Sequence, residues 1–372
     1  MIVRNVLFLA EGQLGDLLLL TPAIRGLKSS FPAATLSVLV VERRLKGPTG
    51  TVTASICGPL GRDADSPLAT NPAVDALYSL NRPALRSLRG FSRLRAELDI
   101  IRFLRSRRFD AVLCTFPEDR FTLWAFASGA AVRVGQKEQG LGWLLSHRPA
   151  IRKETKGVLQ YYCDLVRSMG GDPETDRTEY AIPSNASKEA GEFLEQQGVA
   201  NQRTLVAVHP GASGDYKIWP PDRFAELISI IRERWHATVL LCYGDQDKPV
   251  IHEIKRHLTT DVVEVNTGDG VSRLAALLAR CSLCVSNDSG PRHLAVAVGI
   301  PTVALFRQHH DREWQVYQET DLCKTVKGDG PCPLCPSGVC LDKIPSGGRF
   351  GSHCIRTITV DRALAAIAPL LQ

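Results

Sequence analysis

The feature that most constrains the fold is a regular alternation of short apolar runs and amphipathic segments in the second half of the chain. The apolar runs have the length of buried strands, and the segments between them repeat apolar residues every three or four positions, as helices do. The expected strands are 204–209, 238–243, 262–265, 283–286 and 302–306, and the expected helices are 221–235, 248–257, 272–280 and 291–298. Such alternation predicts a parallel sheet with helices on both faces.

The first half repeats the alternation less regularly. Strands are expected at 5–10, 35–41 and 111–115, helices at 17–29 and 85–104, a long loop at 46–72, and a last helix at 360–370 with Asp361 as a candidate N-cap. Because 372 residues suffice for two ordinary domains, we expect two α/β domains. Their expected bounds are 1–175 and 186–372, with a polar linker between them.

Composition argues against a membrane span. The longest apolar stretch, Leu294 to Phe306, is interrupted by Gly299 and Pro301 and is shorter than the roughly 18 residues that a span requires. The N-terminal apolar run has no cleavage site after it, so a cytoplasmic protein is expected.

Charge is unevenly distributed between the two halves. Residues 1–175 hold 24 Lys+Arg against 16 Asp+Glu, a net +8, whereas 176–372 hold 21 against 23, a net −2. This asymmetry indicates that the first domain meets a phosphorylated lipid, a membrane surface or nucleic acid. Nucleic acid is not expected, because no binding motif or interleaved aromatic residue accompanies the charge.

Residues 285–295 form the strongest local pattern. An expected strand ends in Asn287-Asp288-Ser289, and Gly290 and Pro291 then open a helix. The unsatisfied N–H groups of a helix N-terminus attract an anion. The alternative is that Asp288 or Ser289 only caps the helix.

A second pattern follows the expected strand 204–209. His209 and Pro210 are followed by Gly211, Ala212 and, a few residues later, Lys217. A glycine-containing loop with one lysine near a helix start is typical of a diphosphate site. Lys217 could equally be a solvated surface lysine.

A third pattern is Gly12-x-x-Gly15-Asp16 at the end of the first expected strand. In an open α/β domain this edge of the sheet binds ligands. A loop carboxylate there can reach the hydroxyl that it deprotonates. The alternative is that Asp16 is an N-cap.

Together the three patterns resemble glycosyltransferase family 9, the lipopolysaccharide heptosyltransferases. The matching segments are Gly15-Asp16 with Thr21-Pro22-Ala23, His209-Pro210-Gly211-Ala212 with Lys217 and Trp219-Pro220, and Asn287-Asp288-Ser289-Gly290-Pro291 with His293-Leu294. The resemblance covers essentially the whole chain. It implies the GT-B architecture, in which two Rossmann-like domains face a cleft, with the acceptor on the first and the nucleotide sugar on the second.

The resemblance also implies roles for individual residues. Asp16 corresponds to the catalytic base, Lys217 to the residue that contacts the donor phosphates, and Asp288 to the residue that contacts the donor sugar. The donor side further includes His209, Gly211, Ala212, Ser289, Gly290, Pro291 and His293. Where the family often has a glutamate for the ribose, this chain has Asp247, which is one methylene shorter.

The implied reaction is an inverting transfer of a sugar, with ADP-heptose as the expected donor and a cell-envelope glycolipid as the acceptor. Lys217 and the helix N-terminus would stabilise the departing diphosphate, so no metal is expected to be required. The pairs Asp63-x-Asp65 and Asp245-x-Asp247 are not expected to bind metal, because such spacing is common by chance. We expect a monomer.

Four of the eleven cysteines are clustered. The spacing Cys332-x2-Cys335-x4-Cys340-x13-Cys354 would let four thiolates meet at a structural zinc or an iron–sulfur cluster. Reduced thiols or a local disulfide are the alternatives.

A basic stripe of Arg82, Arg86, Arg89 and Arg93 is expected on the first turns of the 85–104 helix. Either it is a solvated face or it contacts phosphorylated lipid at the inner leaflet. Arg86 and Arg89, with Gly15, are the candidate acceptor-side residues.

Two other functions remain open from the sequence. One is a nucleotide-sugar epimerase or hydrolase of the same fold, which would need further acids and bases in the cleft. The other is a non-catalytic nucleotide-sugar binder, or a scaffold stabilised by zinc.

Overall fold

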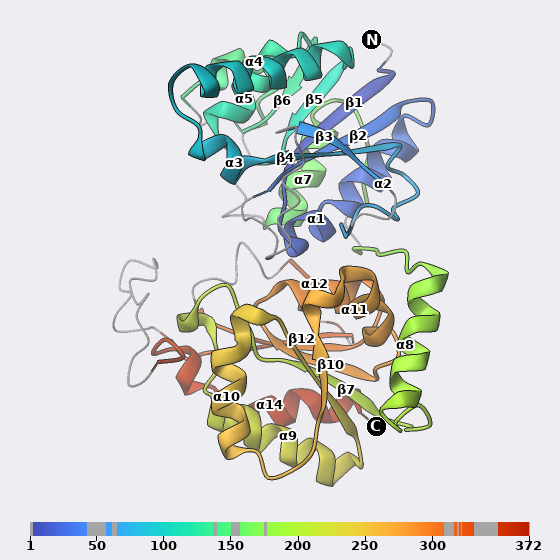
Figure 1. Cartoon of the computed structure of the whole chain (residues 1–372), viewed down its shortest axis with the longest axis vertical. Coiled ribbons are helices and arrows are strands. Elements are labelled where there is room, and N and C mark those ends of the chain that lie inside the picture. Colours follow the sequence, from blue (N-terminus) through green and yellow to red (C-terminus); the bar gives the residue numbers. More distant parts are fainter. Residues whose placement is uncertain are drawn as a thin grey trace. The chain divides into compact units, whose positions relative to one another are not determined.

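The structure is a computed structural model that describes residues 3–42, 57–61, 65–136, 140–149, 157–174, 177–308, 316–317, 320, 322–330 and 349–371. The chain divides into two compact units, residues 1–178 and 179–372 (Figure 1). Each unit contains one six-stranded sheet flanked by helices, so both domains are α/β as expected. No described helix is long and apolar enough to cross a membrane.

Unit 1 begins with the strand that precedes the Gly12-x-x-Gly15-Asp16 pattern. Its elements are β1 (Asn5–Glu11), α1 (Leu14–Leu19), α2 (Thr21–Ser30), β2 (Thr35–Glu42), β3 (Cys57–Leu60), β4 (Ala76–Asn81), α3 (Arg82–Ser87), α4 (Gly90–Ser106), β5 (Ala111–Cys114), α5 (Asp119–Ala127), β6 (Val132–Val134), η1 (Gly142–Leu144) and α7 (Val158–Arg167).

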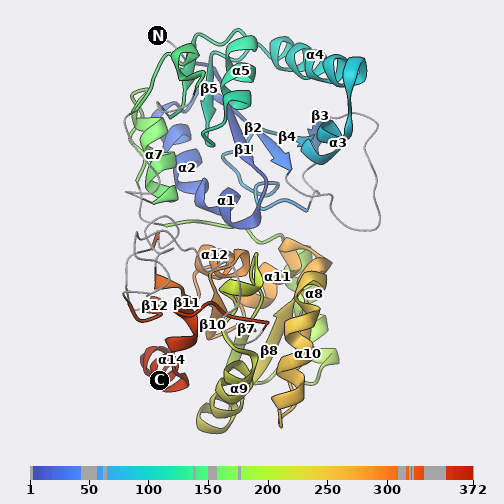
Figure 2. The ribbon, with the colours of Figure 1, turned by 90° about the vertical axis from the view of Figure 1, so that its left-hand side faces the viewer.

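The sheet of unit 1 has the strand order β3-β4-β2-β1-β5-β6. All neighbouring pairs are parallel except β3 with β4. Leu7 and Leu9 of β1 are buried in one cluster with the inner residues of α4 and α5. Helices α2 and α7 pack together on the other face of the sheet. Figure 2 shows these two helices next to α1.

The expected helix over 17–29 is wrong in its bounds, because it is two helices. α1 starts at Leu14, so Asp16 lies in the first turn of a helix and not in a loop. The break at Leu20 has a local cause: Pro22 has no N–H to donate to the carbonyl of Leu18. The hydroxyl of Thr21 donates to that carbonyl instead, at 2.7 Å.

Two further expectations in unit 1 are corrected. Residues 57–60, expected in the long loop, form β3, an edge strand that accommodates Pro59. The expected helix over 85–104 is α3 and α4, interrupted before Gly90. Gly90 has φ +54°, a left-handed conformation that favours glycine.

Unit 2 follows the predicted alternation closely. Its elements are α8 (Ser184–Gln196), β7 (Leu205–His209), η2 (Asp215–Lys217), α9 (Pro221–Trp235), β8 (Thr238–Tyr243), η3 (Asp245–Asp247), α10 (Lys248–His257), β9 (Val263–Asn266), η4 (Thr267–Asp269), α11 (Val271–Leu278), β10 (Leu283–Asn287), α12 (Gly290–Ala297), β11 (Thr302–Phe306), β12 (Cys323–Lys327), η6 (Ile355–Thr357), α14 (Val360–Ile367) and η7 (Ala368–Leu370). The N-cap of α14 is Thr359 and not Asp361, because the Thr359 side chain accepts the Arg362 N–H.

The sheet of unit 2 is entirely parallel, with the order β12-β11-β10-β7-β8-β9. In chain order this is 6-5-4-1-2-3, the doubly wound arrangement of Rossmann domains. The core on one face joins β7 and β8 to α9, α10 and α14 around the fully buried Trp219. The two sheets share one feature. In unit 1, β1 lies between β2 and β5, and in unit 2, β7 lies between β8 and β10.

Candidate active site

The patterns at 285–295 and at His209–Lys217, both in unit 2, meet at one point of its sheet. β7 and β10 are hydrogen-bonded neighbours, although β8 and β9 come between them in the chain. In doubly wound domains the helices that follow two such strands lie on opposite faces, and a ligand-binding crevice is expected at the carboxyl ends of the strands. His209 ends β7 and Asn287 ends β10, which brings the two loops that follow them together.

Asn287 fastens these two loops to each other. Its Nδ2 donates to the carbonyl of Pro210 at 2.6 Å, and its Oδ1 accepts the backbone N–H of Trp219 at 3.1 Å. The side chain is completely buried. One amide thus fixes both ends of the segment that carries Lys217.

Lys217 and Asp288 form an ion pair in this crevice. The distance between Nζ and Oδ2 is 3.0 Å, and the two side chains are only 13% and 10% exposed. Burial alone would raise the pKa of Asp288, but the charges of Lys217 and Arg292 and the hydrogen bond from Lys217 outweigh it and leave that pKa lowered. The alternative that Lys217 is a solvated surface lysine is therefore wrong.

His209 is held between two neighbours from other strand ends. Its Nδ1 shares a hydrogen bond with the Ser289 hydroxyl at 3.1 Å, and its Nε2 lies 3.6 Å from Oδ2 of Asp247. The same Oδ2 accepts the Gly244 N–H at 2.9 Å. Gly211 packs so closely on Asp247 that a Cβ at position 211 would lie 2.2 Å from its Oδ1. This close approach explains the glycine.

The N-terminus of α12 opens into the same cluster. Ser289 is its N-cap residue but makes no side-chain cap bond, and the Asp288 carboxylate is directed to Lys217. The alternative that either residue merely caps the helix is therefore wrong. The first turn begins with Gly290, Pro291 and Arg292. Pro291 has no N–H, and the N–H groups of Gly290 and Arg292 are in the position where a helix N-terminus binds an anion.

Two buried side chains, Arg292 and His293, follow in this helix. Arg292 was not among the candidates from the sequence. Its guanidinium carbon lies 4.7 Å from the ring centre of Phe306 and 5.2 Å from that of Tyr317. Its Nε and Nη1 have no hydrogen-bond partner among the residues that the structure describes. Burial lowers its pKa. Arg292 occupies the variable position of the family pattern, so the pattern could not have singled it out.

His293, which the resemblance had singled out, is also buried. Its Nδ1 shares a hydrogen bond with the Tyr317 hydroxyl at 3.0 Å. Burial, reinforced by the charge of Arg292, lowers the pKa of His293 to about 3. The imidazole is therefore neutral at physiological pH.

The carboxyl edge of the unit 1 sheet carries Asp16. Asp16 is 8% exposed in the first turn of α1, and Gly15 beside it is buried. Asp16 is the third residue of this helix, so the N-cap alternative is wrong; the N-cap residue is Gln13. A Cβ on Gly12 would lie 2.8 Å from Val40, which explains the glycine at this crossing.

An ion-pair network that sequence reasoning missed lies at the carboxyl ends of β1, β4 and β5. Arg82 is 7% exposed, and its Nη2 donates to both carboxylate oxygens of Glu118, at 2.5 and 2.6 Å. Its Nη1 lies 3.4 Å from Oε1 of Glu11. Arg82 is thus not part of an exposed basic stripe, unlike Arg86 and Arg89, which are exposed.

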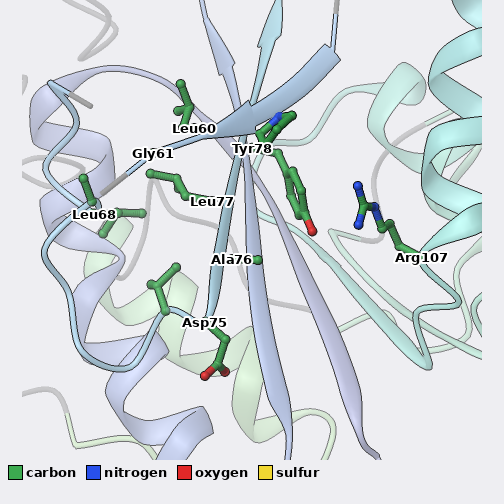
Figure 3. Close-up of a pocket in the computed structure, with 11 residues that line it drawn as sticks. Leu60, Gly61, Leu68, Asp75, Ala76, Leu77, Tyr78 and Arg107 are labelled. Atoms are coloured by element: carbon green, nitrogen blue, oxygen red, sulfur yellow. The ribbon is translucent and has the colours of Figure 1, made fainter. Parts of the chain in front are cut away.

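A hollow of about 350 Å³ lies elsewhere in unit 1, along the edge formed by β3 and β4 (Figure 3). Asp75 and Ala76 line it at the start of β4, so it borders the amino end of a parallel strand and not the carboxyl edge. Its charged groups are engaged, since Asp75 pairs with Lys28 and Arg107 stacks on Tyr78. The hollow therefore does not belong to the candidate site.

Among the described residues, no group of three or more His, Cys, Asp or Glu side chains could hold a metal ion. Cys354 is buried, while Cys332, Cys335 and Cys340 lie outside the described residues. Asp63 lies outside them too, and Asp245 is an exposed residue paired with Lys248.

Comparison with known proteins gives consistent matches. The sequence model of "Glycosyltransferase family 9 (heptosyltransferase)" matches residues 98–332. That range includes the whole donor-side cluster but begins after Asp16. Lipopolysaccharide heptosyltransferase 3 of Escherichia coli is 24% identical over 297 residues, which cover 78% of this chain and 80% of that protein.

Two solved structures have the same fold along almost the whole chain. A glycosyltransferase family 9 protein from Veillonella parvula aligns with a TM-score of 0.78 at 18% identity, covering 99% of this chain and 97% of that one. The E. coli heptosyltransferase WaaC with ADP-2-deoxy-2-fluoro heptose aligns with a TM-score of 0.66 at 15% identity, covering 98% and 99%. The two α/β units accordingly have the GT-B fold.

Proposed function

The chain belongs to glycosyltransferase family 9, and we propose that it transfers heptose from ADP-heptose, with inversion, to a glycolipid of the lipopolysaccharide core or cell envelope. The observation that carries this proposal is the buried cluster of Lys217, Asp288, His209 and Ser289 at the N-terminus of α12. The relatives named for lipopolysaccharide heptosyl transfer and the neighbour with a fluorinated ADP-heptose support the choice of donor and acceptor.

The donor diphosphate binds between Lys217 and the first turn of α12. The ammonium group carries three donors, of which the bond to Asp288 uses one, and the others can reach phosphate oxygens. Asp288 keeps the lysine in place and contacts the donor sugar, while Asp247 lies beside the ribose. Because this charge is preorganised and largely removed from water, it stabilises the negative charge that develops on the leaving ADP.

Asp16 is the base. An acceptor hydroxyl attacks the anomeric carbon, its proton passes to the Asp16 carboxylate, and the bond between the anomeric carbon and the diphosphate oxygen breaks. The electron pair of that bond leaves with ADP. A single displacement from the face opposite the leaving group inverts the anomeric configuration. Gly15, Arg86 and Arg89 are assigned to the acceptor side, and the location is cytoplasmic and peripheral to the inner leaflet.

Donor binding is tested by thermal unfolding with a panel of nucleotide sugars. ADP-heptose at about 100 times its Kd should stabilise the protein by about 2.7 kcal/mol. Lys217→Ala should remove most of this shift, whereas the exposed control Lys248→Ala should retain it. A response to UDP sugars alone would contradict the proposed donor.

The reaction is tested with Asp16→Asn, which keeps the shape of the side chain but removes the base. We expect the variant to keep the ADP-heptose thermal shift and to lose roughly 10²-fold or more in transfer rate. Turnover of the donor without any acceptor would instead indicate the hydrolase or epimerase. Unchanged transfer by the variant would exclude Asp16 as the base.

A further inference from the structure

Helix α4 carries apolar residues on two opposite sides. Ala96, Ile100 and Leu104 are buried against the sheet of unit 1, at 6%, 1% and 0% exposure. Successive helical residues are about 100° apart, so Leu98 points roughly 200° away from both Ala96 and Ile100. Leu98 is 43% exposed, and Phe91 is 79% exposed. The side of α4 that faces solvent is therefore also apolar.

The large apolar side chains of α4 include three that face solvent. Phe91, Leu94 and Leu98 are all exposed. Seven large apolar side chains are exposed among the described residues, and five of them lie on α4 and α5: Phe91, Leu94, Leu98, Leu123 and Phe126. A hydrogen bond connects the two helices: the indole N–H of Trp124 on α5 donates to the carboxylate of Glu97 on α4 at 3.0 Å. Figures 1 and 2 show α4 on the outside of unit 1.

Arginine side chains surround the exposed apolar residues of α4. Arg95, Arg102 and Arg105 are exposed and lie within about 60° of Phe91 around the helix axis. Between residues 82 and 108 there are nine arginines, no lysine and two acidic residues. Both acids are engaged, Glu97 with Arg120 and Asp99 with Arg102. The surface is thus apolar at its centre and positively charged around it.

We propose that this surface, formed by Phe91, Leu94 and Leu98 with Arg95, Arg102 and Arg105, docks on the anionic phospholipid surface of a bilayer. Apolar side chains enter the boundary between headgroups and acyl chains, while guanidinium groups remain at the phosphates. A second copy of the chain fits less well, because a symmetric contact would place each arginine row against its own copy. The inference rests on the proposed function in one respect: a glycolipid acceptor lies in such a bilayer.

The test is co-sedimentation of the full chain with vesicles of phosphatidylcholine, either alone or mixed with phosphatidylglycerol. We expect binding to the mixed vesicles that weakens with added salt, and little binding to phosphatidylcholine alone. Phe91→Ser with Leu94→Ser should reduce binding to the mixed vesicles at least about tenfold. Arg95→Gln with Arg102→Gln should reduce binding and its dependence on salt.

Matched controls lie in unit 2. Leu322→Ser removes an apolar side chain that is 52% exposed, close to the 56% of Leu94, and Arg256→Gln removes an exposed arginine of α10. Both should bind vesicles as the unchanged protein does. Equal loss in the controls, or equal binding to vesicles without phosphatidylglycerol, would overturn the inference.

Two measurements separate this inference from the proposed function. The α4 variants should transfer heptose to a delipidated, water-soluble acceptor at the unchanged rate and keep the ADP-heptose thermal shift. Absence of vesicle binding together with intact transfer would overturn the docking surface alone. If light scattering shows a dimer that the α4 substitutions dissociate, and no vesicle binding occurs, the surface is an interface between copies and the inference is wrong.

Discussion

At the scale of single residues, the donor-side cluster depends on side chains that bond to the backbone of another loop. Asn287 is the central example, because its amide joins Pro210 and Trp219 across the two loops. It appears in the family pattern, but its role cannot be read from the sequence, because its two partners lie in other loops. Lys217 and Asp288 could be assigned roles from the sequence, because a lysine and an aspartate are charged whatever their neighbours are.

Asn287→Ala should be strongly destabilising. It leaves a buried N–H and a buried carbonyl without their partner, each worth about 1–3 kcal/mol, so we expect a loss of roughly 2–6 kcal/mol in the free energy of unfolding. Denaturant titration measures this loss. Asn287→Asp retains the acceptor for Trp219 but places a buried carboxylate oxygen against the Pro210 carbonyl, so it should lose at least as much; a smaller loss would show that the bond to Pro210 contributes little.

His293 should make stability depend on pH. Its pKa is lowered to about 3 in the folded chain, from the ordinary value of 6.5. Between these values the unfolded chain binds a proton at this position and the folded chain does not. The free energy of unfolding therefore falls as the pH is lowered from about 6.5 toward 3, by up to about 1.4 kcal/mol per pH unit.

His293→Gln should flatten this dependence in urea titrations between pH 7 and about pH 4. His252→Gln, an exposed change on α10, serves as the control and should leave it unaltered. Identical slopes for His293→Gln and the unchanged protein would show that His293 is not the responsible group. Asp288, whose pKa is also lowered, contributes only below its ordinary value of 3.8.

At the scale of elements, the second half of the chain was more predictable than the first. The bounds predicted for α9, α10, β8 and β11 are those observed. Proline or glycine marks the ends of most of these elements, and such residues can be read locally. In α4 the sequence offers two apolar stripes with helical spacing, and only packing against the sheet decides which is buried.

Two truncations on α4 distinguish its two sides. Leu104→Ala, at a position with 0% exposure, should lower the free energy of unfolding by about 2–5 kcal/mol. Leu94→Ala, at 56% exposure, should change it by less than about 0.5 kcal/mol. Urea titration of both variants is sufficient, and comparable losses would mean that Leu94 is also part of the core.

At the scale of the whole molecule, alternation along the chain predicted two α/β domains but not their strand order. That order places β7 beside β10 in unit 2 and β1 beside β5 in unit 1, and each candidate site lies at such a junction. The network of Arg82, Glu11 and Glu118 could not be predicted, because its members are separated by 71 and 36 positions and meet only through the sheet.

Metal removal tests whether the protein's own charges suffice at the donor site. If Lys217 and the N-terminus of α12 stabilise the leaving diphosphate, dialysis against EDTA should leave the rate of heptose transfer within about twofold. Loss of transfer that magnesium or zinc restores would contradict this expectation. Metal analysis of the protein before dialysis would also show whether the cysteines at 332–354 hold a metal.

The exclusive use of arginine between residues 82 and 108 limits how the proposed docking can be regulated. Guanidinium groups keep their charge throughout the physiological pH range, and the acetylation that neutralises lysine has no target on this stretch. Attachment would therefore respond to the abundance of acidic lipid and to ionic strength, and a cell would detach the protein by altering its membrane and not by modifying this helix.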